Sequence, residues 1–575
     1  MAQEKDMISS PVDASIAREI QQKEAANKWQ NRRHSEWDDN YTLYRNKVKI
    51  NRLTQRQAVN IPLMKETIKT LMSKIDEAPV IDWKELSGNV EKEIILQEKW
   101  NSDFRSFNFE GVDIQDKKNV LLYGRGFKKL NFYDGQCRIN ALDIYDIVVD
   151  PLMDPLDIET ARYVIHQNIF KSLRDILADP RYDKASKERL KVYLSSDEAI
   201  VQSAENKEDL EKKQERLRTM GVTSSEFESL GAGDTVLNLT EQIFHLWDKK
   251  QDKWVRYVDV YANNNIRLLH LPLIEAIGVD FYPYVTWGED VETQDVWSDG
   301  PADIVRTPNK ILNVWFSQMI ENRTLKNFQM HWYDATTKNY KPQTYEPGPG
   351  RMLPAPGDPS KTIKPVEISG LGDTLLQIDF LIKMVERGTA ATASQKGVSE
   401  KKQITLGEVQ MMVGEANERV LGMSKFYRRS WEELAMKWYG INEANVGSNE
   451  STTLYKTSSK GVIWPKKVKA AQWISTAGYK AIAKSKEAQE EEKTKNLQVL
   501  TYVKSLMPEN AALAKIIQKR SLDLIDLSVE EIREVEEAEK NIPAPIPQEQ
   551  TQPQQQSPEE QQLAEGAKRL TELAT

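Results

Sequence analysis

Cysteine is almost missing from this chain of 575 residues, which contains only Cys137. One thiol excludes a framework of internal disulfides and favours synthesis in a reducing cytosol. We interpret Cys137 as a small residue on a strand. Long apolar runs are missing too, because the longest, such as 147–149 and 268–274, fall far short of the ~20 apolar residues that cross a bilayer. We therefore expect no membrane span, and the polar first residues predict no secretory signal.

Positive charge is in deficit, with 79 Lys and Arg residues against 87 Asp and Glu residues and a formal net charge of −8. Domains that bind nucleic acid by neutralising many phosphates are usually strongly basic, so this class is disfavoured. An acidic wall with only local lysines would repel phosphate, which suits a conduit. The charge therefore argues against a broad grip on DNA, but not against DNA in transit.

Motifs for catalysis are also missing. The chain has neither a phosphate-binding GxxxxGK[ST] loop nor a GxSxG nucleophile turn. The histidines lie far apart, without a second ligand at zinc-site spacing: His34, His166, His245, His270 and His331. One group of carboxylates could hold a divalent ion, although turns and caps are the simpler interpretation: Asp143, Asp146, Asp150, Asp154 and Asp157. We expect no enzyme, no metal and no cofactor, with a metal-dependent nuclease as a less favoured alternative.

What the chain does contain is a mixture of helical and strand patterns, with enough apolar residues (39%) for a sizeable core. Helical patterns cover 14–45, 62–78, 92–107, 171–228 and 467–540. Strand patterns cover 120–150, 242–270 and 452–466. Asp134 and Gly135 mark a hairpin turn in the first of these, and 248–252 and 263–265 mark turns in the second. The predicted fold class is α+β, predominantly helical.

Two helices with an insert between them form the most informative pattern. The first covers 301–326, and Pro308 should kink it or mark its first turn. The second covers 371–390. Apolar residues recur along both in steps of three and four, which makes seams suited to a neighbouring helix, and include Trp315, Met319, Leu375, Ile378 and Ile382. The segment between them is studded with proline and glycine from Pro342 to Gly370, which predicts a projecting tip.

A loop and a long helix follow. Residues 391–404 are small and polar, contain Lys396, Lys401 and Lys402, and predict an exposed loop. Thr405 and Glu408 have the spacing of a capping box. The helix that they begin continues to about residue 438 and would span on the order of 50 Å. This order of elements indicates a hairpin that holds a tip and a loop in fixed places, not a catalytic pocket.

This succession resembles the portal proteins of tailed bacteriophages. The resemblance rests on the order of the segments 57–83, 143–167 and 298–327, the insert, and the loop with its long helix. It covers roughly residues 14 to 540 and implies a ring-forming subunit of portal-type wing, stem, clip and crown architecture. The implied parts are a flexible N-terminus (1–13), wing (14–297), first stem helix (298–327), clip (328–370), second stem helix (371–390), tunnel loop (391–404), long wing helix (405–440), wing return strands (441–466), helical crown (467–540) and a Pro/Gln-rich, disordered tail with a short helix (541–575).

The resemblance implies a ring, usually of twelve subunits, at one capsid vertex of the virion. Such a ring is the channel through which double-stranded DNA is packaged and ejected, without sequence specificity. The implied partners are terminase, capsid and scaffolding proteins, and tail adaptor or neck proteins, and the implied place of synthesis is the host cytoplasm. A non-viral helical scaffold or adaptor, using its seams for partner helices, is the main alternative.

Candidate site residues follow from the implied parts. DNA-facing candidates are Lys396, Lys401, Lys402, Lys383 and Arg387. Candidates for partner docking at the clip are Arg351, Lys361 and Lys364. The apolar seam residues Trp315, Met319, Leu375, Ile378 and Ile382 would pack between neighbouring subunits.

Overall fold

The computed structural model describes residues 16–47, 59–75, 78–133, 135–194, 197–220, 235–248, 252–264, 266–291, 295–327, 331–333, 358, 363–365, 374–389, 391, 406–447, 450–457, 463–485, 494–495, 498–499 and 501–502. The chain divides into two compact units, Met1–Lys456 with Pro465–Thr494, and Thr457–Trp464 with Lys495–Thr575. The elements below belong to the first unit, apart from Thr457 and residues 463–464, which belong to the second unit. In the second unit, residues 498–499 and 501–502 have helical backbone.

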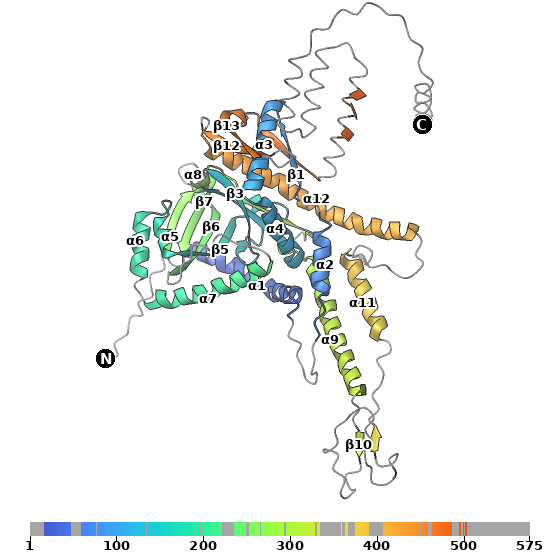
Figure 1. Ribbon diagram of the computed structural model, residues 1–575. Coiled ribbons are helices and arrows are strands. Elements are labelled where there is room, and N and C mark those ends of the chain that lie inside the picture. The colour runs from blue at the N-terminus through green and yellow to red at the C-terminus, as the bar shows by residue number, and fades with distance from the viewer. Residues whose placement is uncertain are drawn as a thin grey trace, which may run out of the picture. The chain divides into compact units, whose positions relative to one another are not determined.

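A five-stranded antiparallel sheet has the order β4-β5-β6-β7-β8, so that sequence neighbours pair (Figure 1). Its strands are β4 (Ile147–Val149), β5 (Tyr163–Ser172), β6 (Val236–Asp248), β7 (Lys253–Ala262) and β8 (Ile266–Pro272). At two of its turns Asp252 and Asn263 adopt φ of 52° and 48°. Asp and Asn tolerate this left-handed backbone because their side chains hydrogen-bond locally. The hairpins predicted over 242–270 are confirmed.

A three-stranded sheet has the order β3-β2-β9, with β2 (Arg125–Tyr133), β3 (Gln136–Ala141) and β9 (Tyr284–Gly288). Tyr133 pairs with Gln136, and Gly135 has φ of 74°, so the predicted Asp-Gly turn is confirmed. Cys137 is buried on β3, as interpreted, and burial raises the pKa of its thiol. The strand predicted from residue 120 is wrong, because residues 120–123 end the buried helix α4 (Phe109–Tyr123). A short apolar run has no periodicity that separates a strand from a buried helix end.

The other helices of this part are α1 (Ala17–Tyr44), α2 (Leu63–Met72), α3 (Val90–Ser106), α5 (Leu173–Ala178), α6 (Lys184–Tyr193), α7 (Asp197–Met220) and α8 (Leu273–Ile277). The helices predicted at 14–45, 62–78 and 92–107 are confirmed with small shifts of their ends. The charged stretch predicted as helical at 171–228 contains α5, α6 and α7 in its described residues. No helix in the described ranges is long and apolar enough to cross a membrane.

The segment predicted as a helical crown departs from that prediction at its start. Strand β14 (Tyr479–Lys484) pairs antiparallel with β1 (Val80–Glu85), with Ala481 opposite Trp83. The buried residues of β14, Tyr479, Ala481 and Ala483, alternate with Lys480 and Ile482, which are exposed and partly buried. Strands β12 (Ser451–Thr457) and β13 (Ile463–Lys469) form a two-stranded sheet, as predicted for 452–466. The α+β fold class is confirmed.

The long helix predicted from 405 is confirmed as α12 (Leu406–Asn445), a helix of 40 residues. Its second half is buried among aromatic side chains. Trp438 lies with its ring centroid 5.1 Å from that of Trp100 and 6.1 Å from that of Trp83, and Trp431 lies 6.3 Å from Trp100. This cluster joins α12 to α3 and β1, so the second half of the long helix runs through the core of the unit.

Candidate functional site: the arm and its anchor

Two helices, α9 (Pro301–Asn327) and α11 (Thr374–Thr389), lie side by side and form an arm (Figure 1). Pro308 lies inside α9 rather than in its first turn. At Gly388 of α11 an added Cβ would lie 2.8 Å from Cγ2 of Ile304, so the helices approach closely where a glycine leaves room. Strands β10 (His331–Tyr333) and β11 (Ile363–Pro365) pair antiparallel between the two helices in sequence. The two predicted helices are thus confirmed as the halves of a hairpin.

The inner face of α11 packs within the chain itself. Ile378 and Val385 are buried, and Ile382 is partly buried against the main core. On α9, Trp315 packs partly buried against the same core and Met319 is half-buried. Of the seam residues, Ile378 is therefore buried inside one chain, whereas Trp315, Met319 and Ile382 are only partly covered by it.

The outer face of α11 remains apolar in part. Leu375, Leu376, Phe380 and Met384 expose 63, 72, 64 and 50% of their surface. Large apolar side chains gathered on one exposed face commonly mark an interaction surface. A surface available to another molecule is therefore present on the arm, but it consists of Leu375 and residues that the seam prediction omitted.

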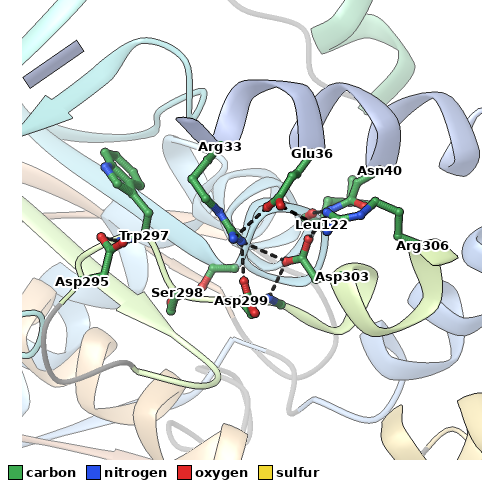
Figure 2. Close-up of polar contacts among 12 residues, drawn as sticks. Arg33, Glu36, Asn40, Leu122, Asp295, Trp297, Ser298, Asp299, Asp303 and Arg306 are labelled. Atoms are coloured by element: carbon green, nitrogen blue, oxygen red, sulfur yellow. Dashed lines mark hydrogen bonds and ion pairs between the residues drawn. The ribbon is translucent and has the colours of Figure 1, made fainter. Parts of the chain in front are cut away.

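The base of the arm is tied to α1 by ion pairs (Figure 2). Arg33 of α1 places Nη2 2.5 Å from Oδ1 of Asp299 and 3.4 Å from Oδ2 of Asp303, and Nη1 2.7 Å from Oε2 of Glu36. Burial lowers the pKa of Arg33, but the carboxylates of Asp303 and Asp299 outweigh it, so the net pKa is raised. The guanidinium therefore stays charged and bridges the loop before α9 to its first turn.

Asp303 is the nearly buried centre of this cluster (Figure 2). It accepts hydrogen bonds from Nη1 of Arg306 at 2.6 Å, Nδ2 of Asn40 at 3.0 Å and the N–H of Gly300 at 2.9 Å. Asn40 also donates to the carbonyl of Leu122 at 2.9 Å. A carboxylate at this position satisfies an N–H at the helix start that has no partner in the helix. The first turn of α9, the C-terminal part of α1 and the end of α4 are thereby joined.

The loop that leads into α9 lies so close to the end of α4 that a glycine is required there, at position 124. Gly124 has φ of 82°, and an added Cβ would lie 1.9 Å from the carbonyl oxygen of Ser298. The hydroxyl of Ser298 in turn donates to the carbonyl of Gly124 at 3.1 Å. A residue with a side chain would be strained in backbone angle and would collide with the backbone of the loop. Gly124 thus lets the segment that leads into α9 lie directly on the end of α4.

A polar stripe along α9 holds an extended segment of the chain. Asn309 accepts from the N–H of Met64 at 2.8 Å and donates to the carbonyl of Ile61 at 3.1 Å. Asn313 accepts from the N–H of Ile61 at 2.7 Å, and Ser317 accepts from the N–H of Val59 at 3.1 Å. Met64 lies in the first turn of α2, whose own N-cap is a proline without a side-chain cap. The arm therefore supplies from outside the cap that α2 lacks.

Tyr427 and Ser430 of α12 hydrogen-bond to two buried ion pairs outside the helix, one within α4 and one between α4 and β2. Nζ of Lys117 lies 2.7 Å from Oδ2 of Asp113, and Oδ1 of Asp113 accepts from the hydroxyl of Tyr427 at 2.5 Å. Nζ of Lys128 lies 2.6 Å from Oδ2 of Asp116 and 3.1 Å from Oγ of Ser430. Burial raises the pKa of Asp113 despite the opposing effects of Lys117 and Tyr427. Buried ion pairs add little stability but disfavour other registers, so they fix where α12 sits along the body.

Only part of the predicted DNA-facing set lies in described residues. Lys383 is exposed on α11 and pairs with Asp379 at 3.0 Å, and Arg387 is exposed one turn further. Three lysines predicted for the loop lie outside the described residues: Lys396, Lys401 and Lys402. Of the clip residues, Lys364 lies on β11, opposite Trp332 of β10, while Arg351 and Lys361 lie outside the described residues.

The aspartates considered for a metal ion have other partners. Asp143 pairs with Arg216 at 2.5 Å, Asp146 with Lys213 at 2.7 Å, and Asp150 with Arg162 at 2.5 Å. Asp154 and Asp157 accept from backbone N–H groups of their own turns, at 2.9 Å each. Within the described ranges no group of His, Cys, Asp or Glu residues is placed to hold a metal ion. Turn capping is confirmed for Asp154 and Asp157 and also for Asp150, which accepts from the N–H of Leu152 at 3.1 Å, whereas the ion pairs of Asp143, Asp146 and Asp150 were not predicted.

Sequence reasoning missed the two structures that anchor the arm. The ion cluster joins residues that are more than 260 positions apart, such as Arg33 and Asp299. No short-range pattern records such a pairing. The stripe of Asn309, Asn313 and Ser317 did leave a signal, since polar residues in steps of four on a helix mark one face. That face was assigned no role from the sequence, and in the structure it is buried.

No protein-family model matches the sequence, and no curated protein matches it. Among solved structures, the fold is similar to a chain in the neck of an empty gene transfer agent particle, with a TM-score of 0.35 and 8% sequence identity over 80% of this chain and 89% of that chain. It is also similar to a chain in the virion of a native gene transfer agent particle, with a TM-score of 0.33 and 9% identity over 70% of this chain and 81% of that chain. At these values the likeness establishes neither a shared fold nor a function.

Proposed function

We propose that this chain is the subunit of a portal ring of a tailed phage, built into one capsid vertex of the virion. The ring is the channel for packaging and ejecting double-stranded DNA and the docking platform for terminase and for tail or neck proteins. The observation that carries the proposal is the arm: a helical hairpin, anchored at its base to an α+β body and followed by a helix of 40 residues. Twelve copies are proposed from the family resemblance alone.

The anchor supports this function because a channel wall needs arms of fixed direction. Arg33 and Asp303 hold the base of α9 on α1, and Asn309 and Asn313 hold its next two turns on the segment before α2. Hydrogen bonds on two sides of one helix leave little freedom for it to pivot. In a cyclic, head-to-tail assembly, each copy would therefore present its arm at the same angle to the axis.

The connection between α11 and α12 supports a contact with passing DNA. Thr389 and Ala391 are buried at the end of α11, and α12 is held by the ion pairs of Asp113 and Asp116. The proposed tunnel loop (391–404) would join α11 to the long helix, whose second half packs in the core. Its lysines would make transient phosphate contacts, which carry no sequence information. The protein itself is proposed to be no enzyme, with terminase supplying the motor activity.

Electron microscopy of the purified full chain in negative stain tests the proposal. We expect rings with a central hole, and a count of subunits in top views gives the stoichiometry. Monomers or elongated dimers at high protein concentration would contradict the portal function and favour the helical scaffold. Cleavage of linear DNA with magnesium that is lost when Asp150 and Asp154 are replaced by alanine would instead favour the nuclease.

A further inference from the structure

The loop between β4 and β5 contains a short sequence repeat. The sequence Asp-Pro-Leu-Met at 150–153 is followed directly by Asp-Pro-Leu-Asp at 154–157. In each copy the N–H of the fourth residue donates to the carbonyl of the first, at 3.1 Å in both. Each copy is therefore one β-turn, with proline at the second position, where its fixed φ favours a turn. The repeat gives two equivalent turns in direct succession.

The aspartate that begins each turn also closes it through its side chain. Oδ1 of Asp150 accepts from the N–H of Leu152 at 3.1 Å, and Oδ1 of Asp154 accepts from the N–H of Leu156 at 2.9 Å. Leu152 and Leu156 expose 78 and 48% of their surface, and the first value is the highest for a large apolar residue in the described ranges. Two leucines are thus presented to solvent from the same position of two identical turns.

Contacts from other parts of the body hold the two turns in place. The guanidinium of Arg125, fully buried on β2, donates from Nη2 to the carbonyl of Pro155. Oγ1 of Thr160 accepts from the N–H of Asp154 at 2.8 Å, and Met153, between the two leucines, is buried in the main core. A loop that is already held in one conformation loses little entropy when it binds a partner. The leucines therefore stand on a rigid base.

The charges beside the leucines indicate the chemistry of a partner. Asp154 and Asp157 are exposed, and in the described part of the chain neither forms an ion pair with a lysine or arginine. Two such carboxylates repel phosphate, which disfavours DNA and lipid headgroups, and they favour a protein surface that carries Lys or Arg. Four residues of chain span at most about 14 Å. One groove on a partner can therefore receive both leucines.

We infer that residues 150–157 form a docking prong, whose two leucines enter an apolar groove, rimmed by Lys or Arg, on a different protein. A different protein is favoured over a second copy because this chain is itself acidic, with a formal net charge of −8. The inference deepens the proposed function and rests on it for the place of the partner, which is the virion. The carboxylates of the prong align it on the basic rim, and the leucines supply the apolar contact.

Photocrosslinking in purified particles tests the prong. The full chain, with p-benzoylphenylalanine in place of Leu152, is incorporated into particles, which are then irradiated. We expect a covalent product with a second virion protein, and mass spectrometry should place the link in an apolar segment flanked by Lys or Arg. The matched control has the same residue in place of Val192, which is 74% exposed on α6, and should not give this product.

Binding measurements with the protein so identified separate the leucines from the charges. The pair Leu152→Ser and Leu156→Ser should weaken binding tenfold or more, as expected when two buried leucines are lost. The pair Asp154→Asn and Asp157→Asn keeps the side-chain acceptors that close the turns and removes both charges. It should weaken binding and reduce its dependence on salt. All four positions are exposed, so the melting temperature of the free chain should not change.

The outcomes separate this inference from the proposed function. Particles that contain the chain but give no product from position 152, a product between two copies of this chain, or an equal yield from the Val192 control would overturn the prong, while the portal proposal stands. An unchanged salt dependence of the asparagine pair would overturn the basic rim. Absence of rings from the unaltered chain would remove the portal proposal, and the partner named here with it. Should the Leu152 variant fail to enter particles, position 156 replaces it.

Discussion

Asn309 hydrogen-bonds to two backbone groups of the segment that leads into α2. Its side-chain oxygen accepts from the N–H of Met64 at the start of α2, and its nitrogen donates to the carbonyl of Ile61. The residue is fully buried on α9, so water cannot replace either partner. A single amide therefore determines whether the segment before α2 is held against the arm.

Replacement of Asn309 by alanine should lower the free energy of unfolding by about 2–3 kcal/mol, because it leaves a buried donor and a buried acceptor without partners. Chemical denaturation followed by tryptophan fluorescence measures this loss. Hydrogen exchange should also become faster at the N–H of Met64. The control is Gln318→Ala, an exposed position of the same helix, for which we expect a change within about 0.5 kcal/mol. Equal effects of the two changes would contradict the capping role.

The ion pair of Asp150 with Arg162 explains one carboxylate of the group considered for a metal ion. Burial raises the pKa of Asp150, but hydrogen bonds from Arg162 and from the N–H of Leu152 outweigh it, so the net pKa is lowered. A carboxylate held ionised by a neighbouring arginine closes a turn between β4 and β5. The same partner occupies the oxygens that a metal ion would need.

At the scale of elements, the arm depends on the closeness of two helices. Gly388 permits the contact with Ile304, and Val385 and Ile378 continue the buried face of α11 toward the far end of the arm. The ion cluster and the asparagine stripe hold α9 alone. Helix α11 is therefore placed by packing on α9, which makes the contact at Gly388 the sensitive point.

Replacement of Gly388 by leucine should separate α11 from α9, because even a Cβ there would lie 2.8 Å from a branched methyl group of Ile304. Limited proteolysis should then cut α11 faster, while the buried tryptophans of the body keep their fluorescence. Gly388→Ala is the informative companion. Its gain of up to ~1 kcal/mol in helix propensity opposes the collision, so we expect a small net effect. Unchanged proteolysis of the leucine variant would show that the contact does not hold the hairpin.

At the scale of the whole molecule, different parts of the chain would serve ring assembly and DNA transport in the proposed portal. Assembly would use the outer apolar face of the arm, whereas contact with DNA would use the loop between α11 and α12. The formal charge of −8 agrees with a conduit that holds phosphate only locally. Changes in the loop should therefore affect transport without affecting the ring.

Deletion of residues 394–403 should leave rings intact by electron microscopy and reduce the DNA content of particles that contain the variant. Substitution of glutamine for Lys396, Lys401 and Lys402 is the milder change. It keeps the length of the loop and removes the charges, so a defect there would be assigned to phosphate contact. A deletion variant that fails to form rings would refute the assignment of this loop to the channel.

Local patterns were sufficient for many elements. The Asp-Gly turn before Gln136 and the apolar spacing along 301–326 and 371–390 each predicted the structure that is observed. Two predictions failed where local patterns are ambiguous. Residues 120–123 form a buried helix end, and Tyr479–Lys484 forms a strand whose partner is β1. Strand pairing over such a distance leaves no mark in the neighbouring residues.

The sequence by itself determined that this chain has an α+β fold with two seamed helices around a proline-rich tip, because turn chemistry and helical spacing are local properties. Only the tertiary structure decided which apolar residues remain exposed. Ile378 and Phe380 are equally apolar and two positions apart, yet one is buried inside the hairpin and the other is 64% exposed. The physical reason is that packing on α9 decides which side of α11 faces the core. No single residue of α11 specifies this orientation.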